Sequence, residues 1–295
     1  CCCARGADVT GDGIADLAIG ADREPSNRDS NSGAVYLLRG GAWLDSAADI
    51  DLASFGTVAA GQLARIRPRP GSVNFHLGAT LTVADLDGNG TAEVLAAATL
   101  NRMGAALSPL GLAGKGSGGT EDGTLFIAWD DNFSGDWVPA PDFVIDAGPG
   151  SYTVIDGGET NEAFSEELLG GLDFDNDGSA DLFAGDLVAD GWGAVSRGNA
   201  GLAHIIYDAA TLKGLEFDLE PDALNEPGPP AGFAMATFIG PVPGAIAGDT
   251  AMQGDFNADG IADVAFSSPH DIPEGRGNAG TLHILLGKNG QWPAV

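Results

Sequence analysis

The sequence has few basic residues for its length. It holds 13 Lys and Arg residues against 42 Asp and Glu residues, a formal net charge of −29. A chain this acidic, with no basic stripe, would be repelled by a phosphate backbone, so we expect no nucleic-acid partner. An anionic membrane surface is disfavoured for the same reason. So large a charge requires a salty medium or bound cations.

Cysteine is absent after the first three positions, Cys1, Cys2 and Cys3. Adjacent cysteines cannot join distant parts of a fold, which excludes a disulfide framework. Two interpretations stay open: the lipidated start of a mature cell-surface protein, or a chain start without that meaning. The sequence also lacks any run of 18 apolar residues, so we expect no membrane-spanning helix.

Glycine and apolar residues, in contrast, are plentiful. There are 46 Gly and 16 Pro residues, and 44% of the sequence is apolar. Many tight turns suit short strands better than long helices, so the composition predicts an all-β fold. We treat residues 1–295 as a single region of that fold.

One short pattern occurs four times. The copies read DVTGDGIAD, DLDGNGTAE, DFDNDGSAD and DFNADGIAD, and their first residues are separated by 77, 88 and 82 positions. Position 1 is always Asp, position 5 is Asp or Asn, position 6 is Gly, and position 9 is an acid. Position 3 always carries an oxygen atom. We refer to these nine-residue segments as loops 1 to 4.

This spacing predicts calcium sites. Calcium takes six to eight oxygen ligands from carboxylates, amides and carbonyls, and side chains at alternate positions of a tight loop can converge on one ion. Glycine at position 6 permits the sharp turn. The predicted ligands are the side chains at positions 1, 3, 5 and 9 and the carbonyl of position 7: Asp8, Thr10, Asp12, Ile14 and Asp16; Asp85, Asp87, Asn89, Thr91 and Glu93; Asp173, Asp175, Asp177, Ser179 and Asp181; Asp255, Asn257, Asp259, Ile261 and Asp263.

Other interpretations of the loops fit less well. A helix-loop-helix calcium hand needs Glu at position 12, where this chain has Ile19, Ala96, Ala184 and Phe266. Magnesium prefers a small octahedral shell that keeps several waters. A chance Asp-Gly turn could explain one copy but not four. We therefore expect about four Ca²⁺ ions.

The flanks of the loops repeat as well. Short apolar runs follow each loop, and a second run opens with Gly33, Gly123, Gly201 or Gly280; both read as strands. The segments PDFVIDA and LEFDLEP suit outer strands. The repeating unit is thus about four strands with the loop between the first two. Such units stack radially as propeller blades. The approximate blades are 1–72, 73–150, 151–231 and 232–295.

The loop and the Asp-Leu-x-x-Gly run after it resemble the FG-GAP repeat of integrin α-subunit propellers and of many secreted bacterial proteins. This resemblance implies a β-propeller, usually of about seven blades, in which four are visible here. It also implies a secreted or cell-surface location and calcium at positions 1, 3, 5, 7 and 9. The family's Gly-Ala-Pro element is degenerate, for example Gly20-Ala21-Asp22.

No residue set predicts catalysis. The sequence has no Gly-x-Ser-x-Gly elbow and no His-Glu-x-x-His helix. His204 and His283 share one repeat position with Tyr36 and Phe126, which favours strand side chains packed between blades over a catalytic or zinc role.

Three functions are compatible with these observations. The leading hypothesis is a non-enzymatic surface scaffold or adhesion module that binds a protein or glycan ligand at the cell surface. A second is a carbohydrate-binding or carbohydrate-active protein, lectin or lyase-like. A third is a subunit of an extracellular fibre that self-associates through open blade edges. The second hypothesis uses aromatic and acidic residues that could stack on sugars: Trp129, Asp130, Asp131, Asp136, Trp137 and Trp192.

Overall fold

The described part of the protein is all-β, with three short 3₁₀ helices of defined bounds. The computed structural model describes residues 5–25, 31–42, 50, 52, 61–68, 75–99, 123–135, 137–138, 140–145, 152–157, 163–192, 195–220 and 228–292. Cys1, Cys2, Cys3 and Asp136 lie outside these ranges. The helices are η3 (Asp130–Asn132), η4 (Ala209–Leu212) and η5 (Pro273–Gly275). No helix in the described residues is long and apolar enough to cross a membrane.

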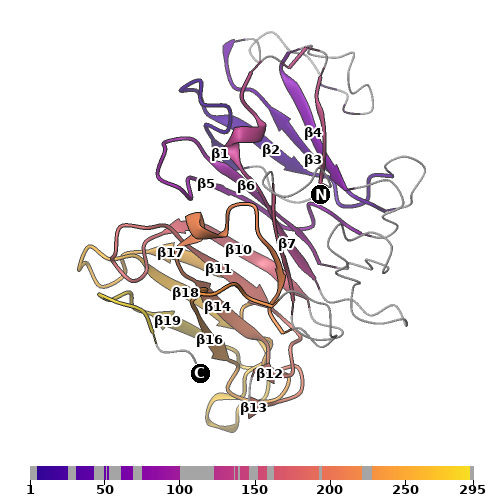
Figure 1. Cartoon of the computed structure of the whole chain (residues 1–295). Coiled ribbons are helices and arrows are strands. Elements are labelled where there is room, and N and C mark those ends of the chain that lie inside the picture. The colour runs from indigo at the N-terminus through magenta and orange to yellow at the C-terminus, as the bar shows by residue number, and fades with distance from the viewer. Residues whose placement is uncertain are drawn as a thin grey trace.

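The strands form four main sheets and one small hairpin (Figure 1). In spatial order, sheet 1 contains β1 (Arg5–Ala7), β2 (Asp16–Gly20), β3 (Val35–Leu38), β4 (Leu63–Pro68) and β8 (Asp142–Ile145). Sheet 2 contains β5 (Leu81–Ala84), β6 (Glu93–Ala98), β7 (Thr124–Ala128), β9 (Tyr152–Asp156) and β15 (Glu216–Asp218). Sheet 3 contains β10 (Phe164–Leu172), β11 (Asp181–Asp186), β14 (Leu202–Ile206) and β16 (Met235–Ile239). Sheet 4 contains β17 (Ala251–Gly254), β18 (Asp263–Ser268) and β19 (Thr281–Leu285), and the hairpin is β12 (Gly191–Trp192) with β13 (Val195–Ser196).

The sequence predicted units of about four strands, and the observed sheets are close to that number. Among the described residues the sheets have five, five, four and three strands. The predicted order of the first two strands is confirmed, since each loop joins the first strand of a sheet to the second. These adjacent strands pair antiparallel, as a hairpin connection requires.

Sheets 1 and 2 each gain an outer strand from further along the chain. β8 follows β7 of sheet 2 but pairs in parallel with β4 of sheet 1. β15 follows β14 of sheet 3 but pairs in parallel with β9 of sheet 2. Crossing segments therefore tie sheet 2 to sheet 1 and sheet 3 to sheet 2. The blade limits at 72, 150 and 231 remain a prediction, and the strands of a sheet do not all come from one predicted segment.

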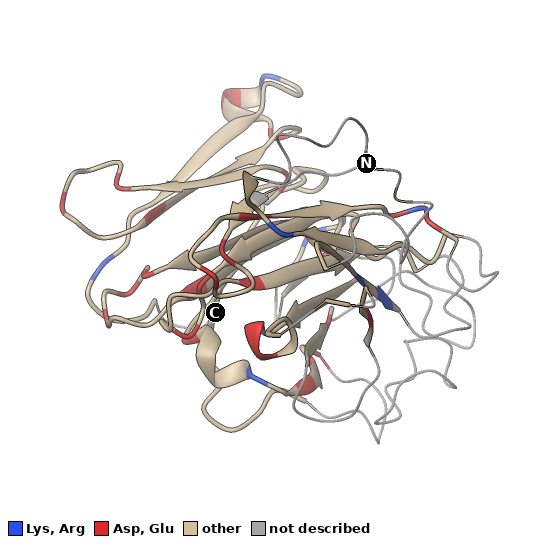
Figure 2. Cartoon of the chain, turned by 90° about the horizontal axis from the view of Figure 1, so that it is seen from above, with Lys and Arg blue, Asp and Glu red and all other residues tan. Residues whose placement is uncertain are grey.

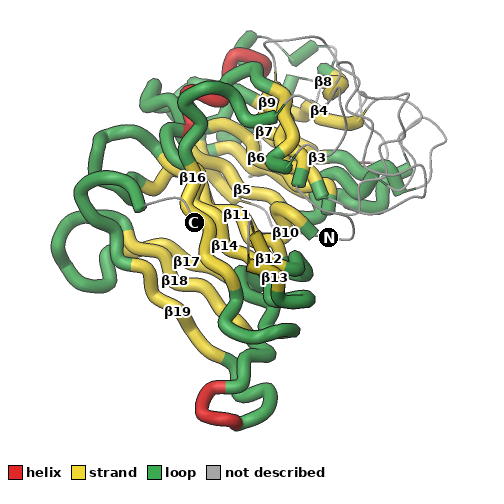
Figure 3. Tube along the Cα trace, turned by 60° about the horizontal axis from the view of Figure 1, so that its bottom comes forward, coloured by secondary structure: helices red, strands yellow, loops and turns green. Residues whose placement is uncertain are grey.

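The four sheets lie one after another in chain order. The first strands of successive sheets contact one another in space: β1 contacts β5, β5 contacts β10, and β10 contacts β17. Figures 1 and 3 show the resulting series from sheet 1 to sheet 4. Within the part of the chain that the structure describes, none of the sheets closes on itself.

The apolar core lies between the sheets. Along β7, Phe126 and Ala128 face the cluster shared with sheet 1, whereas Leu125 and Ile127 face the cluster shared with sheet 3. This is the alternation expected of a strand covered on both faces. Each pair of neighbouring sheets is thus held by burial of apolar side chains on facing strands.

Sheet 4 presents an apolar face to solvent. The side chains of Leu282, Ile284 and Met252 are 63%, 52% and 57% exposed. Ile284 occupies the repeat position of Ile127, which is fully buried. The same side of the sheet is thus covered in sheet 2 and open in sheet 4.

His204 is part of the packing and is fully buried on β14. Its ring lies edge-on to Phe164, with 6.0 Å between ring centroids, and its Nδ1 lies 3.0 Å from Oγ1 of Thr237. Burial lowers the pKa of His204 to about 3. The structure therefore gives this histidine a packing environment.

Replacing His204 by Phe should make the protein less sensitive to acid. A histidine in the unfolded chain titrates near pH 6.5, so between about pH 6.5 and 3 the unfolded state binds a proton that the folded state does not. The contribution of neutral His204 to the unfolding free energy is fully present above pH 6.5 and is lost as the pH falls from about 6.5 to 3. Urea unfolding at pH 7.5 and 5.0 measures the difference.

The expected result is a smaller loss of unfolding free energy between the two pH values in His204→Phe than in the wild type. His283→Phe is the matched control, because His283 holds the same repeat position but is only partly buried. An equal acid dependence in wild type and His204→Phe would contradict the prediction.

Candidate metal centres

The four loops share one backbone feature, a left-handed residue at position 6. The glycine at position 6 has a positive φ in every loop, 82° at Gly13, 90° at Gly90, 92° at Gly178 and 87° at Gly260. A side chain there would meet no atom within 4 Å, so the restriction comes from the backbone angle and not from space.

The aspartate at position 1 organises each loop from within. In loop 2, Oδ1 of Asp85 accepts hydrogen bonds from the amides of Gly88 and Asn89 at 2.8 and 3.2 Å, and Oδ2 accepts from Gly90 at 2.8 Å. The position-1 aspartates of the other loops accept from the amides of positions 5 and 6 in the same way. These bonds explain why Asp begins all four copies: a short carboxylate satisfies several amides of a tight turn.

The side chain at position 5 closes the second half of the turn. Its Oδ1 accepts a hydrogen bond from the amide of position 7, at 2.9 Å in loop 1, 2.7 Å in loops 2 and 3, and 2.9 Å in loop 4. Asn89 accepts this hydrogen bond in the same way as the three aspartates. The tolerance of Asp or Asn at position 5 follows from this shared acceptor.

The acid at position 9 is buried in every loop and ties the loop to the sheet. Asp16, Glu93, Asp181 and Asp263 are at most 2% exposed. Each accepts from the amide of position 2, at 2.6 to 2.9 Å. In loops 1, 3 and 4 the other oxygen accepts from an amide just after the third strand of the sheet, that of Gly40, Asp208 or Gly287. The predicted ligand at position 9 thus also has a structural task.

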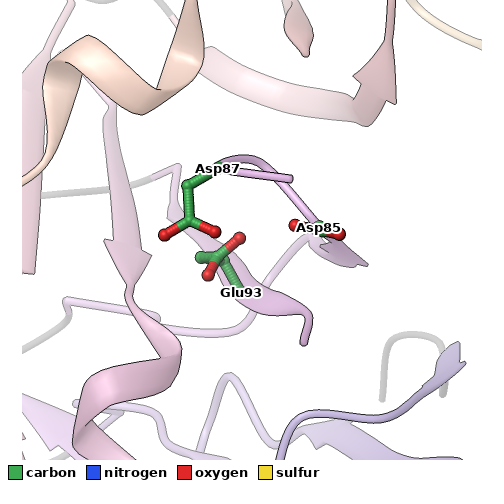
Figure 4. A group of neighbouring side chains, drawn as sticks. All are labelled: Asp85, Asp87 and Glu93. Carbon is green, nitrogen blue, oxygen red and sulfur yellow. The ribbon is translucent and has the colours of Figure 1, made fainter. Parts of the chain in front are cut away.

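Two loops bring three carboxylates together. Ligand atoms of Asp85, Asp87 and Glu93 all lie within 4.8 Å of one another, and so do those of Asp173, Asp175 and Asp177. Figure 4 shows Asp87 and Glu93 facing each other, with Asp85 beside them. Loops 1 and 4 have Thr10 and Asn257 at position 3, and within the described residues they form no such group of three acids.

Buried oxygen atoms without hydrogen bonds occur in three loops. They are Oε1 of Glu93, Oδ1 of Asp175 and Oγ1 of Thr10. A buried polar atom without a partner is costly, so native proteins normally satisfy it. A calcium ion bonded to these oxygens would do so, and an all-oxygen donor set is the one calcium prefers. The residues present therefore fit a calcium ion.

The charges in loops 2 and 3 are unfavourable without a cation. Burial, followed by repulsion from Asp87 and Asp130, raises the pKa of Glu93 to about 8. Burial and nearby carboxylates raise the pKa of Asp181 to about 7 and also raise the pKa of Asp175. Figure 2 marks acidic positions in many of the turns, with few Lys or Arg among them. A bound divalent cation would remove this repulsion.

The loops also contact the neighbouring sheets. The amide of Ala92 in loop 2 donates to the carbonyl of Asp8 in loop 1 at 2.7 Å. Beyond β19, the amides of Lys288 and Gly290 donate to Phe174 and Asp175 of loop 3 at 3.1 and 2.8 Å. A well-ordered loop therefore also stabilises the contact between two neighbouring sheets.

Two of the three tryptophans considered for sugar binding are not available for stacking. Trp129 is fully buried and Trp137 is 2% exposed. The indole nitrogen of Trp129 donates to Thr153 at 2.9 Å, and that of Trp137 donates to the carbonyl of Phe133 at 3.1 Å. Both rings belong to the core. The side chain of Trp192 and residue Asp136 are outside the described residues.

Comparison with known proteins supports the repeat assignment. The family model of the FG-GAP repeat matches residues 4–38 and 247–285, which contain loops 1 and 4. The comparison with curated proteins gave no match. A rhamnogalacturonan lyase PL11 of Bacillus licheniformis is one similar solved structure, with 14% identity and a TM-score of 0.41 over 88% of this chain; the chain covers 38% of that protein. The segments 4–38 and 247–285 match the FG-GAP repeat, as the resemblance predicted.

Proposed function

We propose that this protein is an extracellular, calcium-stabilised β-propeller scaffold whose role is to bind a ligand and not to catalyse a reaction. The observation that supports it most is the pair of three-carboxylate groups in loops 2 and 3, with buried oxygens that have no hydrogen bond. Their donor sets and their position in the first hairpin of a sheet match the pattern predicted for calcium.

Calcium would stabilise the joints between blades. Each loop closes the hairpin of the first two strands, and loops 1 and 3 receive hydrogen bonds from the following sheet. An ion that neutralises a loop removes the repulsion that opposes this docking. Four ions would add eight positive charges to a chain of net charge −29.

The propeller architecture is part of this proposal. The first strands of consecutive sheets contact each other in order, as strands around a propeller axis do. The ring of about seven blades implied by the resemblance would need sheets besides the four described. The ligand would be a protein or glycan at the cell surface, bound by the variable loops that a rigid scaffold positions.

Calcium removal tests the proposal. Stabilisation by a bound ligand grows as RT ln(1 + [L]/Kd), about 2.7 kcal/mol per site at one hundred times the Kd. For two or more sites in a chain of this size, we expect chelation to lower Tm by on the order of 5–10 °C. Differential scanning calorimetry in 1 mM calcium and in excess chelator measures this shift.

Two further arms make the test specific. The double variant Asp85→Asn with Asp173→Asn should lose most of the calcium-dependent shift, because it removes a carboxylate from each three-acid group. Magnesium at the same concentration is the matched control ion and should restore much less of the shift. Identical melting of the wild type with calcium and with chelator would overturn the proposal.

A further inference from the structure

Lys213 places an ammonium group at the edge of loop 2. Its Nζ lies 3.6 Å from Oδ2 of Asp87, the position-3 residue of that loop. It also lies 2.8 Å from Oδ2 of Asp131 and 3.9 Å from Oδ1 of Asp130. Lys213 therefore pairs with a predicted calcium ligand and with two acids of η3.

This lysine comes from the segment that links sheet 3 to sheet 2. It directly follows η4, between β14 and β15. The amide of Ala209 donates to the carbonyl of Ala180 at 2.8 Å, and the carbonyl of Leu212 accepts from the hydroxyl of Thr153 on β9 at 2.5 Å. The backbone before Lys213 is thus fixed to both sheets, which directs the side chain to loop 2.

Contacts along the side chain keep the ammonium in place. Nζ lies 5.1 Å from the centroid of the Trp129 ring, within the range of a cation–π interaction. Asp130 is itself bonded to loop 2, since Nδ2 of Asn89 donates to its Oδ2 at 2.9 Å. The loop, η3 and Lys213 form one connected polar group.

The ammonium group of Lys213 does not pair with the buried carboxylate of loop 2. Glu93 is fully buried and belongs to the group with Asp85 and Asp87. Its Oε1 has no hydrogen bond of ordinary geometry, although the backbone of Asp130 acts on this carboxylate and partly offsets the rise in its pKa that burial causes. Lys213 is not within ion-pair distance of Glu93 in the described structure. The lysine therefore offsets the charge of Asp87 and leaves an oxygen of Glu93 for a metal ion.

Loop 3 provides the contrast. It has the same hairpin position and its own three-acid group, Asp173, Asp175 and Asp177. Among the described residues no Lys or Arg lies within 4.0 Å of these carboxylates. A positive charge from the following sheet is thus specific to loop 2.

We infer that Lys213 is a tethered cation that competes with calcium for Asp87 and thereby weakens calcium binding at loop 2 relative to loop 3. The inference rests on the proposed calcium binding. When calcium binds, Lys213 releases Asp87 and keeps Asp131, which is exposed and outside the loop. Calcium at loop 2 is thereby coupled to the crossing segment between sheets 3 and 2.

Lys213→Met tests the competition. Methionine keeps an unbranched side chain next to Trp129 and removes the charge. Removing one positive charge about 4 Å from a ligand of a divalent ion should tighten one class of sites by about tenfold at low salt. The gain should shrink as salt rises, because this charge is partly exposed and screened. Isothermal titration calorimetry with calcium at 20 and 300 mM KCl measures both effects.

Two variants control for unrelated effects. Lys288→Met is the matched control, because Nζ of Lys288 lies 4.5 Å from the Trp292 ring centroid and makes no ion pair with a carboxylate among the described residues; it should bind calcium as the wild type does. In an Asp85→Asn background, which disables loop 2, Lys213→Met should have no effect. Thermal melting adds a second readout: Lys213→Met should lower Tm in chelator and show a larger rise on calcium addition.

The outcomes separate the two proposals. If Lys213→Met binds calcium with wild-type affinity while Asp85→Asn loses a site, the competition by Lys213 is ruled out and the proposed calcium binding stands. Weaker binding in Lys213→Met also overturns it, since the lysine would then support the site. No calcium binding by the wild type overturns the proposed function itself.

Discussion

Replacing Ile127 by alanine should destabilise the protein by about 2–5 kcal/mol, whereas the same change at Ile284 should cost less than about 1 kcal/mol. The two residues hold the same repeat position on β7 and β19. Ile127 is fully buried in the cluster between sheets 2 and 3, and Ile284 is 52% exposed. The cost of the substitution depends on lost contacts and on the cavity left behind, and only Ile127 has a full set of contacts to lose.

Urea unfolding at low protein concentration, with calcium present, measures both variants. Ile205→Ala serves as a second buried case, because Ile205 holds the same position on β14 and is also fully buried. A cost at Ile284 that equals the cost at Ile127 would mean that the open face of sheet 4 is covered in solution. Sedimentation velocity on the same samples would show whether a second copy covers it.

The hairpins and loops could be predicted from sequence because their determinants are local. Position 1 of each loop bonds amides up to five residues later, and the strands on either side follow at once. Repetition supplied the remaining information, since four copies with one spacing exclude a chance turn. The strand assignments and the place of each loop between the first two strands of a sheet are therefore confirmed.

The features that the sequence did not reveal depend on distant parts of the chain. The segments of β8 and β15 read as outer strands, but nothing in their few residues specifies parallel pairing with the preceding sheet. Trp129 stands beside Asp130 and Asp131 in sequence, yet its ring enters the core because strand alternation from β7 continues through it. Lys213 carries no motif, and only the fold brings it to Asp87.

The structural role of the acid at position 9 could have been predicted from the sequence. This residue is also the first residue of the second strand in every sheet, namely Asp16, Glu93, Asp181 and Asp263. A carboxylate at the start of a buried strand must find hydrogen-bond donors, because leaving it unpaired in the interior is costly. An acid at that place is therefore expected to bond backbone amides whether or not a metal is present.

Replacing Asp16 by Asn should lower the unfolding free energy by about 2–4 kcal/mol even in excess chelator. Oδ2 of Asp16 accepts from the amides of Val9 and Thr10 at 2.9 and 3.0 Å, and Oδ1 accepts from Gly40 at 2.9 Å. An asparagine can accept on one side only, so its NH₂ group would face an amide donor on the other. Each buried amide left without an acceptor costs about 1–3 kcal/mol.

Asp12→Asn is the matched control in the same loop. Asp12 is exposed, and its Oδ1 accepts from Ile14 at 2.9 Å, a bond that asparagine keeps and that Asn89 already makes in loop 2. Asp12→Asn should therefore match the wild type in chelator and gain less stability on calcium addition. Urea unfolding of both variants with and without calcium distinguishes the roles. If Asp16→Asn instead matches the wild type in chelator and loses only the calcium response, position 9 acts as a ligand alone, and the buried amides of the hairpin have another acceptor.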